Sequence, residues 1–316
     1  MKPRINCLGV LVVDALSGPL ARYPEPRVQI QVVTESIRFA PGGGAANTSG
    51  ALARMGLPVA VFSKVGDDPN GAFLLRELGQ LGVNTAGIRV SHTDSTPFTF
   101  VGIHPAGGGL EPARTFIHTP GANKTFCIDD LDRERLFDAH FLLYQDLWVL
   151  PRLDGPTAAG LLAEAQRRGV VTLLDECWGL GPNRETFEAM LPHCDFALPS
   201  LEDVQVIYPG KSADDIAGHI LACGAKAAIL KMGAEGCLIA RGTEKVRVPA
   251  FRVEVVDTTG AGDCWNAGFI AGLANGEAMH SAARLGNACS AFCIQAVGGC
   301  TGVPGYAAVR DLAQTL

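Results

Sequence analysis

Apolar and polar positions along the chain follow a pattern that predicts strands and helices in alternation. Continuous apolar runs are typical of strands that are buried on both faces, and they occur at 5–13, 59–65, 140–144, 170–174 and 227–230. The segments between them have helical spacing and end near a glycine, as at 45–55, 156–168 and 213–223. This alternation predicts an α/β fold with a central, mostly parallel sheet and helices on both of its faces.

Two early segments do not follow the alternation. The stretch 17–40 includes a period-two pattern at 28–32, and the stretch 95–119 contains two strand-like runs joined by a glycine cluster. A period of two predicts half-buried strands. We therefore expect one domain over 1–316, with lid strands inserted at about 17–40 and 95–119 that form a small separate β-sheet.

Composition and charge narrow the class of protein. The chain has 316 residues, of which 47% are hydrophobic and 18% charged, so a large buried core is expected and a disordered chain is excluded. The formal net charge is −6, and no run of Lys and Arg exceeds two residues, which argues against a nucleic-acid partner. The uncharged stretch 285–309 contains Asn287, Gly298 and Pro304, which argues against a membrane span.

The ten cysteines and the start of the chain bear on location. No two cysteines form a Cys-x-x-Cys pair, and Met1-Lys2-Pro3-Arg4 leads into a strand-like run, whereas a cleavable signal would continue as an apolar helix. Free thiols are typical of a reducing compartment. We expect a cytoplasmic protein.

A glycine-containing segment late in the chain carries the strongest chemical signal. The segment 257–263 reads Asp-Thr-Thr-Gly-Ala-Gly-Asp, follows a strand-like run at 251–256 and opens an apolar helix at 262–274. Its glycines let backbone amides turn toward one point, and a helix N-terminus adds partial positive charge, so the segment predicts a phosphate-binding turn. Asp263 would repel an anion unless it accepts the proton of a hydroxyl nucleophile. A tight turn with a capping aspartate is the alternative.

Two other glycine patterns do not carry the chemistry that they suggest at first. Gly210-Lys211-Ser212 resembles the end of a P-loop, but position 205 is Gln, so the required first glycine is missing. The stretch 42–47 resembles a dinucleotide-binding turn, but it lacks the last glycine and no strand directly precedes it. Neither pattern therefore predicts a nucleotide site by itself.

Several segments, in order along the chain, resemble the ribokinase-like (PfkB) carbohydrate kinases. The segment 257–269 closely resembles the second signature of that family, and Gly42-Gly43-Gly44-Ala45-Ala46-Asn47 resembles the first. The segments 63–68 and 121–123, together with Gly71, also match. The resemblance covers essentially the whole chain. It implies a ribokinase-like fold with a mostly parallel central sheet, helices on both faces and a small β-sheet lid.

The same resemblance implies roles on the acceptor side. The base that takes the proton of the acceptor hydroxyl would be Asp263, and the anion hole would be formed by Gly260, Ala261 and Gly262. The residues that hold the sugar would be Asp14, Gly42, Gly43 and Asn47. A carboxylate at a strand end can accept two hydroxyl hydrogen bonds, which agrees with this role for Asp14. A plain strand-ending aspartate and a glycine-rich helix entry remain the alternatives.

On the nucleotide side, the resemblance implies that ATP contacts Lys231, Gly233, Asn287 and Gly299. Lys231 would meet a phosphate, or it is a lone surface lysine. Asn287 would line the adenine pocket, or it makes a hydrogen bond between helices. Both alternatives stay open at the level of the sequence.

Metal ions are implied by the resemblance as well. The family usually has Asn-x-x-Glu near Mg²⁺ and the phosphates, whereas this chain has Ser200 and Asp203 at those places, and Glu202 competes with Asp203 for the role. A shorter carboxylate can still hold Mg²⁺ through water, so Mg²⁺-ATP is retained. A monovalent cation, K⁺, would be held by Asp257, Thr259 and nearby carbonyl oxygens.

These observations together predict an ATP-dependent sugar kinase that transfers the γ-phosphate of ATP to a hydroxymethyl group of a small carbohydrate. The lid would exclude water, and by resemblance it would pair between two subunits of a homodimer. A nucleoside kinase of the same fold and a sugar-binding protein that has lost catalysis are the alternatives. Whether the acceptor sugar already carries a phosphate stays open.

Overall fold

The computed structural model describes residues 2–20, 29, 31–104, 113–177 and 181–315 as two β-sheets and the helices around them. The larger sheet has nine strands in the order β13-β12-β11-β10-β9-β8-β1-β4-β5. In this order, all neighbours from β11 to β5 pair in parallel. Strands β12 and β13 form an antiparallel hairpin at one edge, and β12 also pairs antiparallel with β11. The bounds are β1 Ile5–Leu8, β4 Val59–Gly66, β5 Asn84–Ser91, β8 Phe141–Leu147, β9 Val171–Glu176, β10 Phe196–Ala197, β11 Ala228–Lys231, β12 Cys237–Arg241 and β13 Glu244–Val248.

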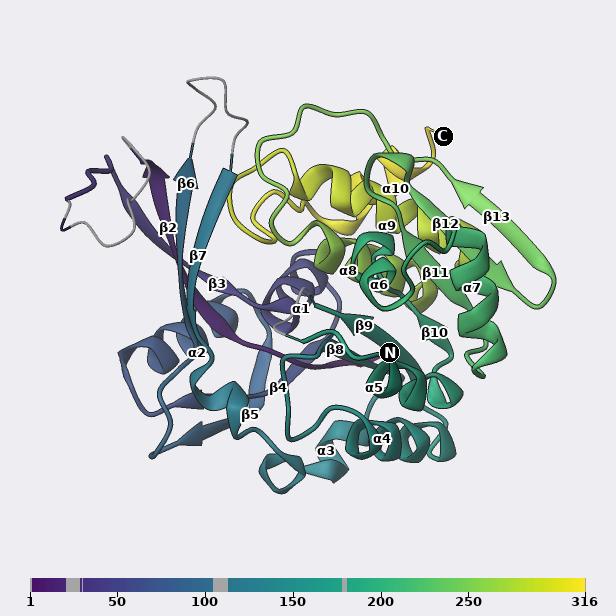
Figure 1. Ribbon diagram of the computed structural model, residues 1–316, viewed down its shortest axis with the longest axis horizontal. Helices are drawn as coiled ribbons and strands as arrows, with labels where there is room; N and C mark the ends of the chain where they lie inside the picture. The colour runs from purple at the N-terminus through teal and green to yellow at the C-terminus, as the bar shows by residue number, and fades with distance from the viewer. Residues whose placement is uncertain (1, 21–28, 30, 105–112, 178–180, 316) are drawn as a thin grey trace.

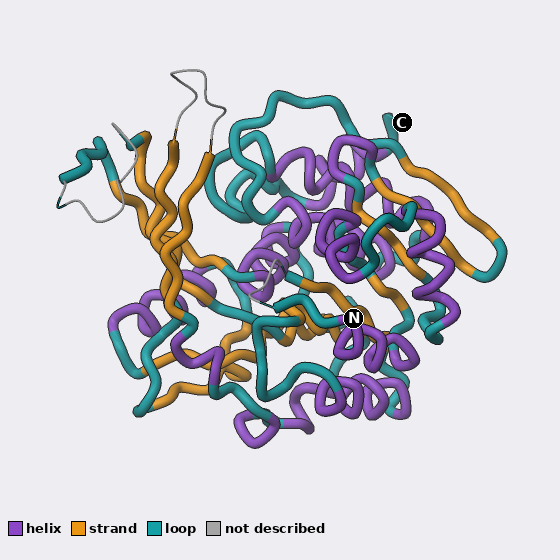
Figure 2. The backbone as a smooth tube through the Cα atoms, viewed as in Figure 1, coloured by secondary structure: helices purple, strands orange, loops and turns teal. Residues whose placement is uncertain are grey.

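The smaller sheet, here called the lid sheet, has four strands in the order β3-β2-β6-β7 and projects away from the larger sheet (Figures 1 and 2). Its strands are β2 Val12–Pro19, β3 Ile37–Gly42, β6 Phe98–His104 and β7 Ala113–Thr119. The predictions of a mostly parallel central sheet and of a small separate sheet are confirmed. Part of the predicted period-two stretch at 28–32 lies outside the described residues, and the described residues 31–36 contain no strand.

Helices cover both faces of the larger sheet. They are α1 Gly44–Arg54, α2 Pro69–Gln80, α3 Arg133–Phe137, α4 Pro156–Arg167, α5 Arg184–Met190, α6 Leu201–Ile207, α7 Ala213–Ala222, α8 Ala261–Ala274, α9 Met279–Cys293 and α10 Tyr306–Ala313. Along β8, Leu143 packs into one hydrophobic cluster, while Leu142 and Tyr144 pack into the other. This period of two places one apolar core on each face of the sheet.

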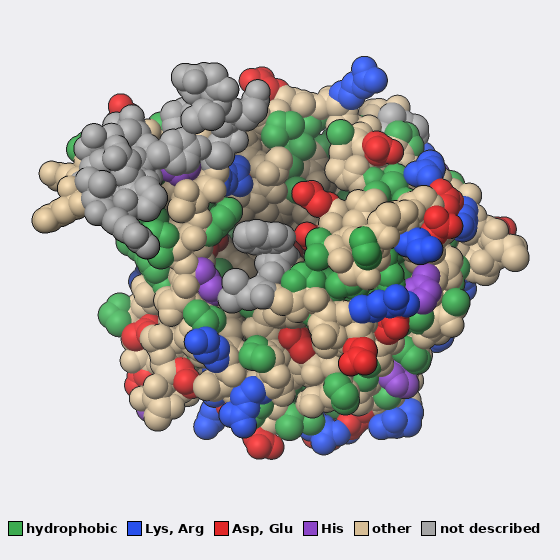
Figure 3. Space-filling model, in the orientation of Figure 1, with side chains coloured by type: hydrophobic (Ala, Val, Ile, Leu, Met, Phe, Trp, Pro, Cys, Tyr) green, Lys and Arg blue, Asp and Glu red, His purple; other side chains and the backbone are tan. Residues whose placement is uncertain are grey.

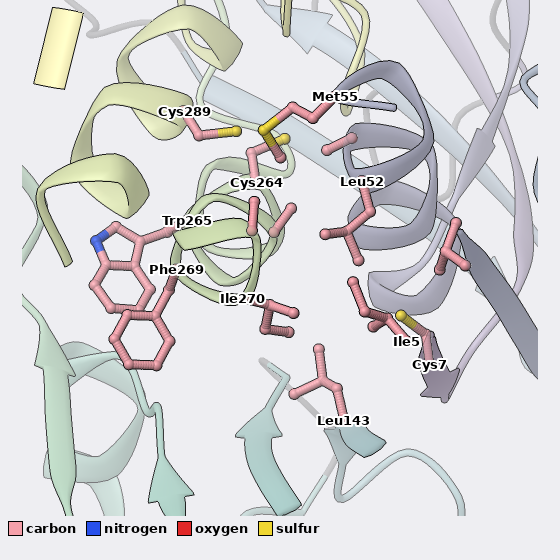
Figure 4. Close-up of a cluster of buried hydrophobic side chains, with 14 of the residues drawn as sticks. Ile5, Cys7, Leu52, Met55, Leu143, Cys264, Trp265, Phe269, Ile270 and Cys289 are labelled. Carbon is pink, nitrogen blue, oxygen red and sulfur yellow. The ribbon is translucent and has the colours of Figure 1, made fainter. Parts of the chain in front are cut away.

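The core on the face of α1, α8 and α9 is the one that positions the chemistry. Ile5 and Leu143 of the sheet meet Leu52 of α1 and Ile270 of α8 in this core (Figure 4). Helix α8 packs along α9, and it also packs on α1. The N-termini of α1 and α8 are thereby held next to each other. Among the described residues, no helix is long and apolar enough to cross a membrane.

Two predicted strands are wrong. The apolar run 5–13 is not one strand ending at Asp14, because β1 ends at Leu8 and the chain leaves the larger sheet before β2 begins at Val12. At this bend Gly9 is required, since a Cβ atom there would lie 2.6 Å from Oδ2 of Asp146. The predicted run 251–256 is not a strand either. The amide of Val256 donates to the carbonyl oxygen of Ile294, outside any sheet.

Candidate active site

The glycine turn before α8 forms the centre of the site. Gly260 caps the helix with a φ of +75°, a conformation that favours glycine, and Ala261 is the first helical residue. A Cβ atom on Gly260 would lie 2.9 Å from Cα of Gly299, so the two glycines are in direct contact. The first amides of a helix have no partner four residues back and can bind an anion. Of these amides, that of Ala261 donates here to the carbonyl oxygen of Thr258 at 3.2 Å.

Asp263 lies in the first turn of α8 and contacts α1. Its Oδ2 accepts a hydrogen bond from Nδ2 of Asn47 at 2.9 Å, and its carbonyl oxygen accepts one from Oγ1 of Thr48 at 3.0 Å. Burial raises the pKa of Asp263, and the neighbouring Asp175 raises it further, while the Asn47 amide and the Lys231 ammonium oppose the shift. The structure thus brings together the predicted base and one predicted sugar ligand.

The other predicted sugar ligands also converge here. Asp14 lies within β2 of the lid sheet, and its carboxylate fills the space that a side chain at Gly42 would need: a Cβ atom on Gly42 would lie 2.0 Å from Oδ2 of Asp14. Gly43 has a φ of +86° and caps α1. Burial raises the pKa of Asp14 to about 7, with a further contribution from the charge of Asp257. The carboxyl group of Asp14 therefore titrates near neutral pH, beside the glycine turn that precedes α1.

A second buried carboxyl group, that of Asp146, supports the glycine turn before α1. It has no role in the sequence-based hypothesis. Its Oδ2 accepts a hydrogen bond from the amide of Val10 at 2.7 Å, and its Oδ1 accepts one from the amide of Gly44 at 3.0 Å. Asp146 has a φ of +60°, which a non-glycine residue rarely adopts. Burial, with the charge of Asp263, raises its pKa to about 8. The one sequence signal for it is the polar pair 145–146 at the end of an apolar strand.

On the other side of the turn before α8 lies Lys231, the last residue of β11. Its Nζ donates to Oδ1 of Asp175 at 2.8 Å, and only 8% of the residue is exposed. A Cβ atom on Gly262 would lie 3.3 Å from this Nζ, so the ammonium group borders the first turn of α8. Burial alone would lower the pKa of Lys231, but the charges of Asp175 and Glu176 raise it above its ordinary value. Lys231 is therefore a buried cation beside the anion hole, and not a surface lysine.

Two carboxyl groups near Lys231, those of Asp175 and Glu176, form an acidic pair that the sequence did not identify. The carboxylate of Asp175 also accepts a hydrogen bond from the side-chain amide of Asn266 in α8. Glu176 is buried, and its Oε1 accepts a hydrogen bond from the amide of Ser200, while its Oε2 has no partner among the described residues. Burial, with the charge of Asp175, raises the pKa of Glu176 well above its ordinary value.

The structure separates the two candidates for the magnesium site. Glu202 is exposed, whereas Asp203 is partly buried and interacts electrostatically with Glu176 and Lys231. Burial is the main cause that raises the pKa of Asp203. Asp203 therefore faces the acidic pair and Glu202 faces solvent. Figure 3 shows a hollow in this face of the molecule, with acidic side chains along its wall.

Three further predicted residues have different positions. Gly233 is exposed just after β11, and a Cβ atom there would meet open space. Gly299 packs against Asn47, whose Oδ1 would lie 2.1 Å from a Cβ atom on Gly299. Asn287 is 5% exposed, and its side chain accepts from Nε1 of Trp265 at 2.7 Å and donates to the carbonyl oxygen of Pro249 at 2.9 Å. The bond with Trp265 joins α9 to α8, and the role of Asn287 in the adenine pocket stays a prediction.

Asp257 and Thr259, predicted as ligands of a monovalent cation, lie in the turn before α8 and are bound by an arginine. Arg114 of β7 donates from Nη2 to Oδ1 of Asp257 at 2.6 Å and from Nη1 to Oγ1 of Thr259 at 2.7 Å. A cation bound by these side-chain oxygens would have to displace the guanidinium group. The two residues do not fit the predicted ion in this structure, and the sequence did not predict that Arg114, at the lid, contacts them.

Comparisons with known proteins agree on one family. A family model described as pfkB family carbohydrate kinase matches residues 8–305. A sugar kinase of Archaeoglobus fulgidus, described as uncharacterized, is 29% identical over 267 residues, which cover 80% of this chain and 98% of that protein. The ribokinase of Bacillus subtilis is 27% identical over 290 residues, which cover 91% of this chain and 92% of that protein.

The fold is found in solved structures as well. The structure of Arabidopsis thaliana ribokinase complexed with ribose and ATP has a TM-score of 0.83 to this chain at 23% identity, and the match covers 99% of each chain. At this identity the likeness shows the ribokinase fold and nothing about substrate. The fold that the resemblance implied is thereby confirmed.

Proposed function

Because the chain belongs to the pfkB family of carbohydrate kinases, we propose that it transfers the γ-phosphate of ATP to a hydroxymethyl group of a small carbohydrate. One observation carries this proposal more than any other. The carboxylate of Asp263 stands at the N-terminus of α8, between Asn47 on one side and the buried Lys231 on the other. In this proposal the base Asp263, the sugar-binding amide of Asn47 and the phosphate-binding ammonium group of Lys231 lie next to one another.

In the proposed reaction, each of these groups has its own role. Asp14, Gly42, Gly43 and Asn47 would hold the acceptor sugar, so that its hydroxymethyl oxygen faces Asp263. Asp263 would accept the proton of this hydroxyl as the oxygen attacks phosphorus. The helix N-terminus at Gly260, Ala261 and Gly262, with the ammonium of Lys231, would neutralise the transferred phosphoryl group. The lid sheet would close over the sugar and exclude water, which would otherwise hydrolyse ATP.

Glu176 of the acidic pair, together with Asp203, fits Mg²⁺. Hard oxygen ligands suit this ion, and Oε2 of Glu176 is buried without a partner among the described residues, close to the charge of Asp203. We assign the site to Glu176 and Asp203, directly or through water. Mg²⁺ bound there would neutralise negative charge on the phosphates of ATP. Lys231 keeps the acidic pair from repelling the nucleotide.

The proposal is tested with purified protein, ATP and Mg²⁺ against a panel of ribose, fructose, 2-keto-3-deoxygluconate, ribose phosphates and adenosine, with ADP release as the measurement. We expect ADP release with at least one free sugar. Turnover with adenosine alone would favour the nucleoside kinase, and turnover with a sugar phosphate alone would identify a phosphorylated acceptor. If no compound gives ADP release while sugars still raise the melting temperature, the protein binds sugar without catalysis.

The raised pKa of Asp14 predicts a pH-dependent affinity for sugar. Its pKa of about 7 means that the carboxyl group changes from mostly neutral at pH 6 to mostly ionised at pH 8. The ionised form accepts stronger hydrogen bonds from sugar hydroxyls. The KM for sugar should therefore fall by roughly five- to tenfold between pH 6 and pH 8. The variant Asp14→Asn should raise KM and remove this dependence.

Initial rates at varied sugar concentration and constant ionic strength measure the effect. The KM for ATP in the same buffers is the control, because Asp14 lies on the acceptor side. A wild-type KM for sugar that is flat with pH, together with an unchanged KM in Asp14→Asn, would contradict the role of Asp14.

We further propose a homodimer that forms through the lid sheet. Ile37 and Phe39 on β3 and Ile117 on β7 are exposed at 51%, 57% and 64%, which is unusual for large apolar side chains on one small sheet. Light scattering should give a dimer for the wild type and a monomer for the double variant Phe39→Lys with Ile117→Lys. Val246→Lys on β13, also an exposed apolar position, should stay dimeric. A monomeric wild type would contradict the proposal.

We also propose a cytoplasmic location, because free cysteines are typical of a reducing compartment. None of the ten cysteines forms a disulfide bond in the described part of the chain.

A further inference from the structure

Arg114 connects the lid sheet to the turn that leads into the anion hole. It lies on β7, opposite Ile103 of β6, and its two terminal nitrogens reach Oδ1 of Asp257 and Oγ1 of Thr259 at 2.6 and 2.7 Å. The side chain of Asp257 is 7% exposed and that of Arg114 is 27% exposed. Two hydrogen bonds to residues two positions apart, one of them an ion pair, fix the orientation of the guanidinium group as well as its charge.

The remaining oxygens that could bind a monovalent cation at this turn also have donors within the chain. The second carboxylate oxygen of Asp257 accepts from the amide of Gly298 at 2.9 Å. The carbonyl oxygen of Gly299 accepts from the thiol of Cys293 at 2.8 Å, and that of Val297 accepts from Oγ1 of Thr301 at 2.8 Å. A carbonyl oxygen has two lone pairs, so one accepted hydrogen bond does not by itself exclude a cation. The guanidinium group of Arg114, however, contacts the side-chain oxygens of Asp257 and Thr259, and its positive charge would repel a second cation at this place. The donor set therefore does not fit a resident cation.

A positive charge is nevertheless needed at this position. Without it, the carboxylate of Asp257 would be nearly buried three residues before Gly260, and its charge would oppose binding of a triphosphate at the helix N-terminus. Hydrogen bonds from the amides of Thr259 and Gly298 contact this carboxylate, and among the described residues Arg114 is the side-chain cation that forms an ion pair with it, at 2.6 Å.

We propose that the guanidinium group of Arg114 takes the place of a monovalent cation in this kinase, and that the enzyme is consequently independent of K⁺. Arg114 is a positioning residue: it holds the turn 257–259 so that the first amides of α8 face the phosphate. Because it lies near the start of β7, opposite Ile103 near the end of β6, it also ties the outer end of the lid sheet to the turn before α8. This inference rests on the proposed kinase activity, but part of its test does not.

The first experiment compares wild-type protein in NaCl, KCl and tetramethylammonium chloride at equal ionic strength. We expect kcat to agree within about 1.5-fold among the salts, and we expect the same melting temperature in NaCl and KCl. A kcat at least threefold higher in KCl, or a melting temperature that rises specifically with K⁺, would overturn the inference. The melting comparison needs no substrate. Absence of turnover in every salt would instead count against the proposed function.

The second experiment removes the guanidinium group. Arg114→Ala should lower kcat about ten- to a hundredfold, the range typical of residues that orient the binding groups of a site without contacting the substrate. Guanidinium ion at low millimolar concentration should restore at least part of kcat, whereas tetramethylammonium should not, and a merely structural arginine would not give this selectivity. Arg89→Ala, on the exposed edge strand β5, is the matched control and should behave as wild type. Wild-type turnover of Arg114→Ala in NaCl, or a loss that guanidinium does not restore, would overturn the proposal.

Discussion

Asp263→Asn is expected to lower kcat by roughly 10²- to 10⁴-fold and to leave the affinity for ATP nearly unchanged. The substitution removes the only group in contact with Asn47 that can accept a proton at the first turn of α8 in the described part of the chain, and it keeps the size of the side chain. The Asn47 amide can still donate to the new side-chain oxygen, so the packing of α1 on α8 should persist. The loss should therefore appear in the chemical step.

Steady-state kinetics give kcat, and calorimetric titration with an ATP analogue gives the affinity. Asp311→Asn, at an exposed position on α10, is the control and should change neither quantity by more than about twofold. Turnover of Asp263→Asn close to that of the wild type would remove Asp263 from the role of base.

The direction of the pKa shift adds a second readout for the same residue. Burial and the nearby Asp175 raise the pKa of Asp263, so the ionised base becomes available at higher pH than an exposed aspartate would. The kcat of the wild type should thus rise with pH on a limb that lies above the ordinary range of a carboxyl group. If kcat is already flat from pH 4 upward, the base is not a buried carboxylate.

Local pattern was enough to predict most of the sheet and the glycine turn before α8. The predicted strand at 59–65 corresponds to β4, and the predicted helix at 156–168 corresponds to α4, because periodicity and glycine stops are local signals. The turn at 257–263 was recognisable for the same reason: its glycines and its aspartate are adjacent in the sequence. The change of sheet at 9–11 was not, since both strands are buried and the run stays apolar throughout.

The residues that the sequence missed act through contacts between distant segments. Arg114 meets Asp257 across 143 positions, and Asp146 binds the amides of Val10 and Gly44 across 136 and 102 positions. A lone polar residue beside an apolar strand does not reveal such a partner. The same limit applies to Asn287, whose hydrogen bond with Trp265 joins α9 to α8 across 22 positions. In each case, the contact joins segments that are apart in the sequence.

Lys231→Met should damage both stability and nucleotide use, because the lysine is a buried cation among carboxylates. Removing one partner of a buried ion pair leaves the other charge without compensation, which typically costs about 3–5 kcal/mol. Asp175 pairs with Lys231 at 2.8 Å, and both side chains are less than a tenth exposed, so this range applies here. The kcat/KM for ATP should fall by roughly 10²- to 10³-fold, as for other losses of a charge aimed at a transferred group.

Two matched variants separate the structural part of this effect from the chemical part. Lys226→Met removes an exposed lysine that pairs with Asp195, and it should cost less than about 1 kcal/mol in denaturant unfolding and leave turnover unchanged. The double variant Lys231→Met with Asp175→Asn removes the stranded carboxylate, and we expect it to recover much of the stability but none of the activity. If the double variant regained activity, Lys231 would act only through Asp175. If Lys231→Met unfolded like Lys226→Met, the cation would not be needed to hold the acidic pair, and its assignment to the phosphate would lose its structural basis.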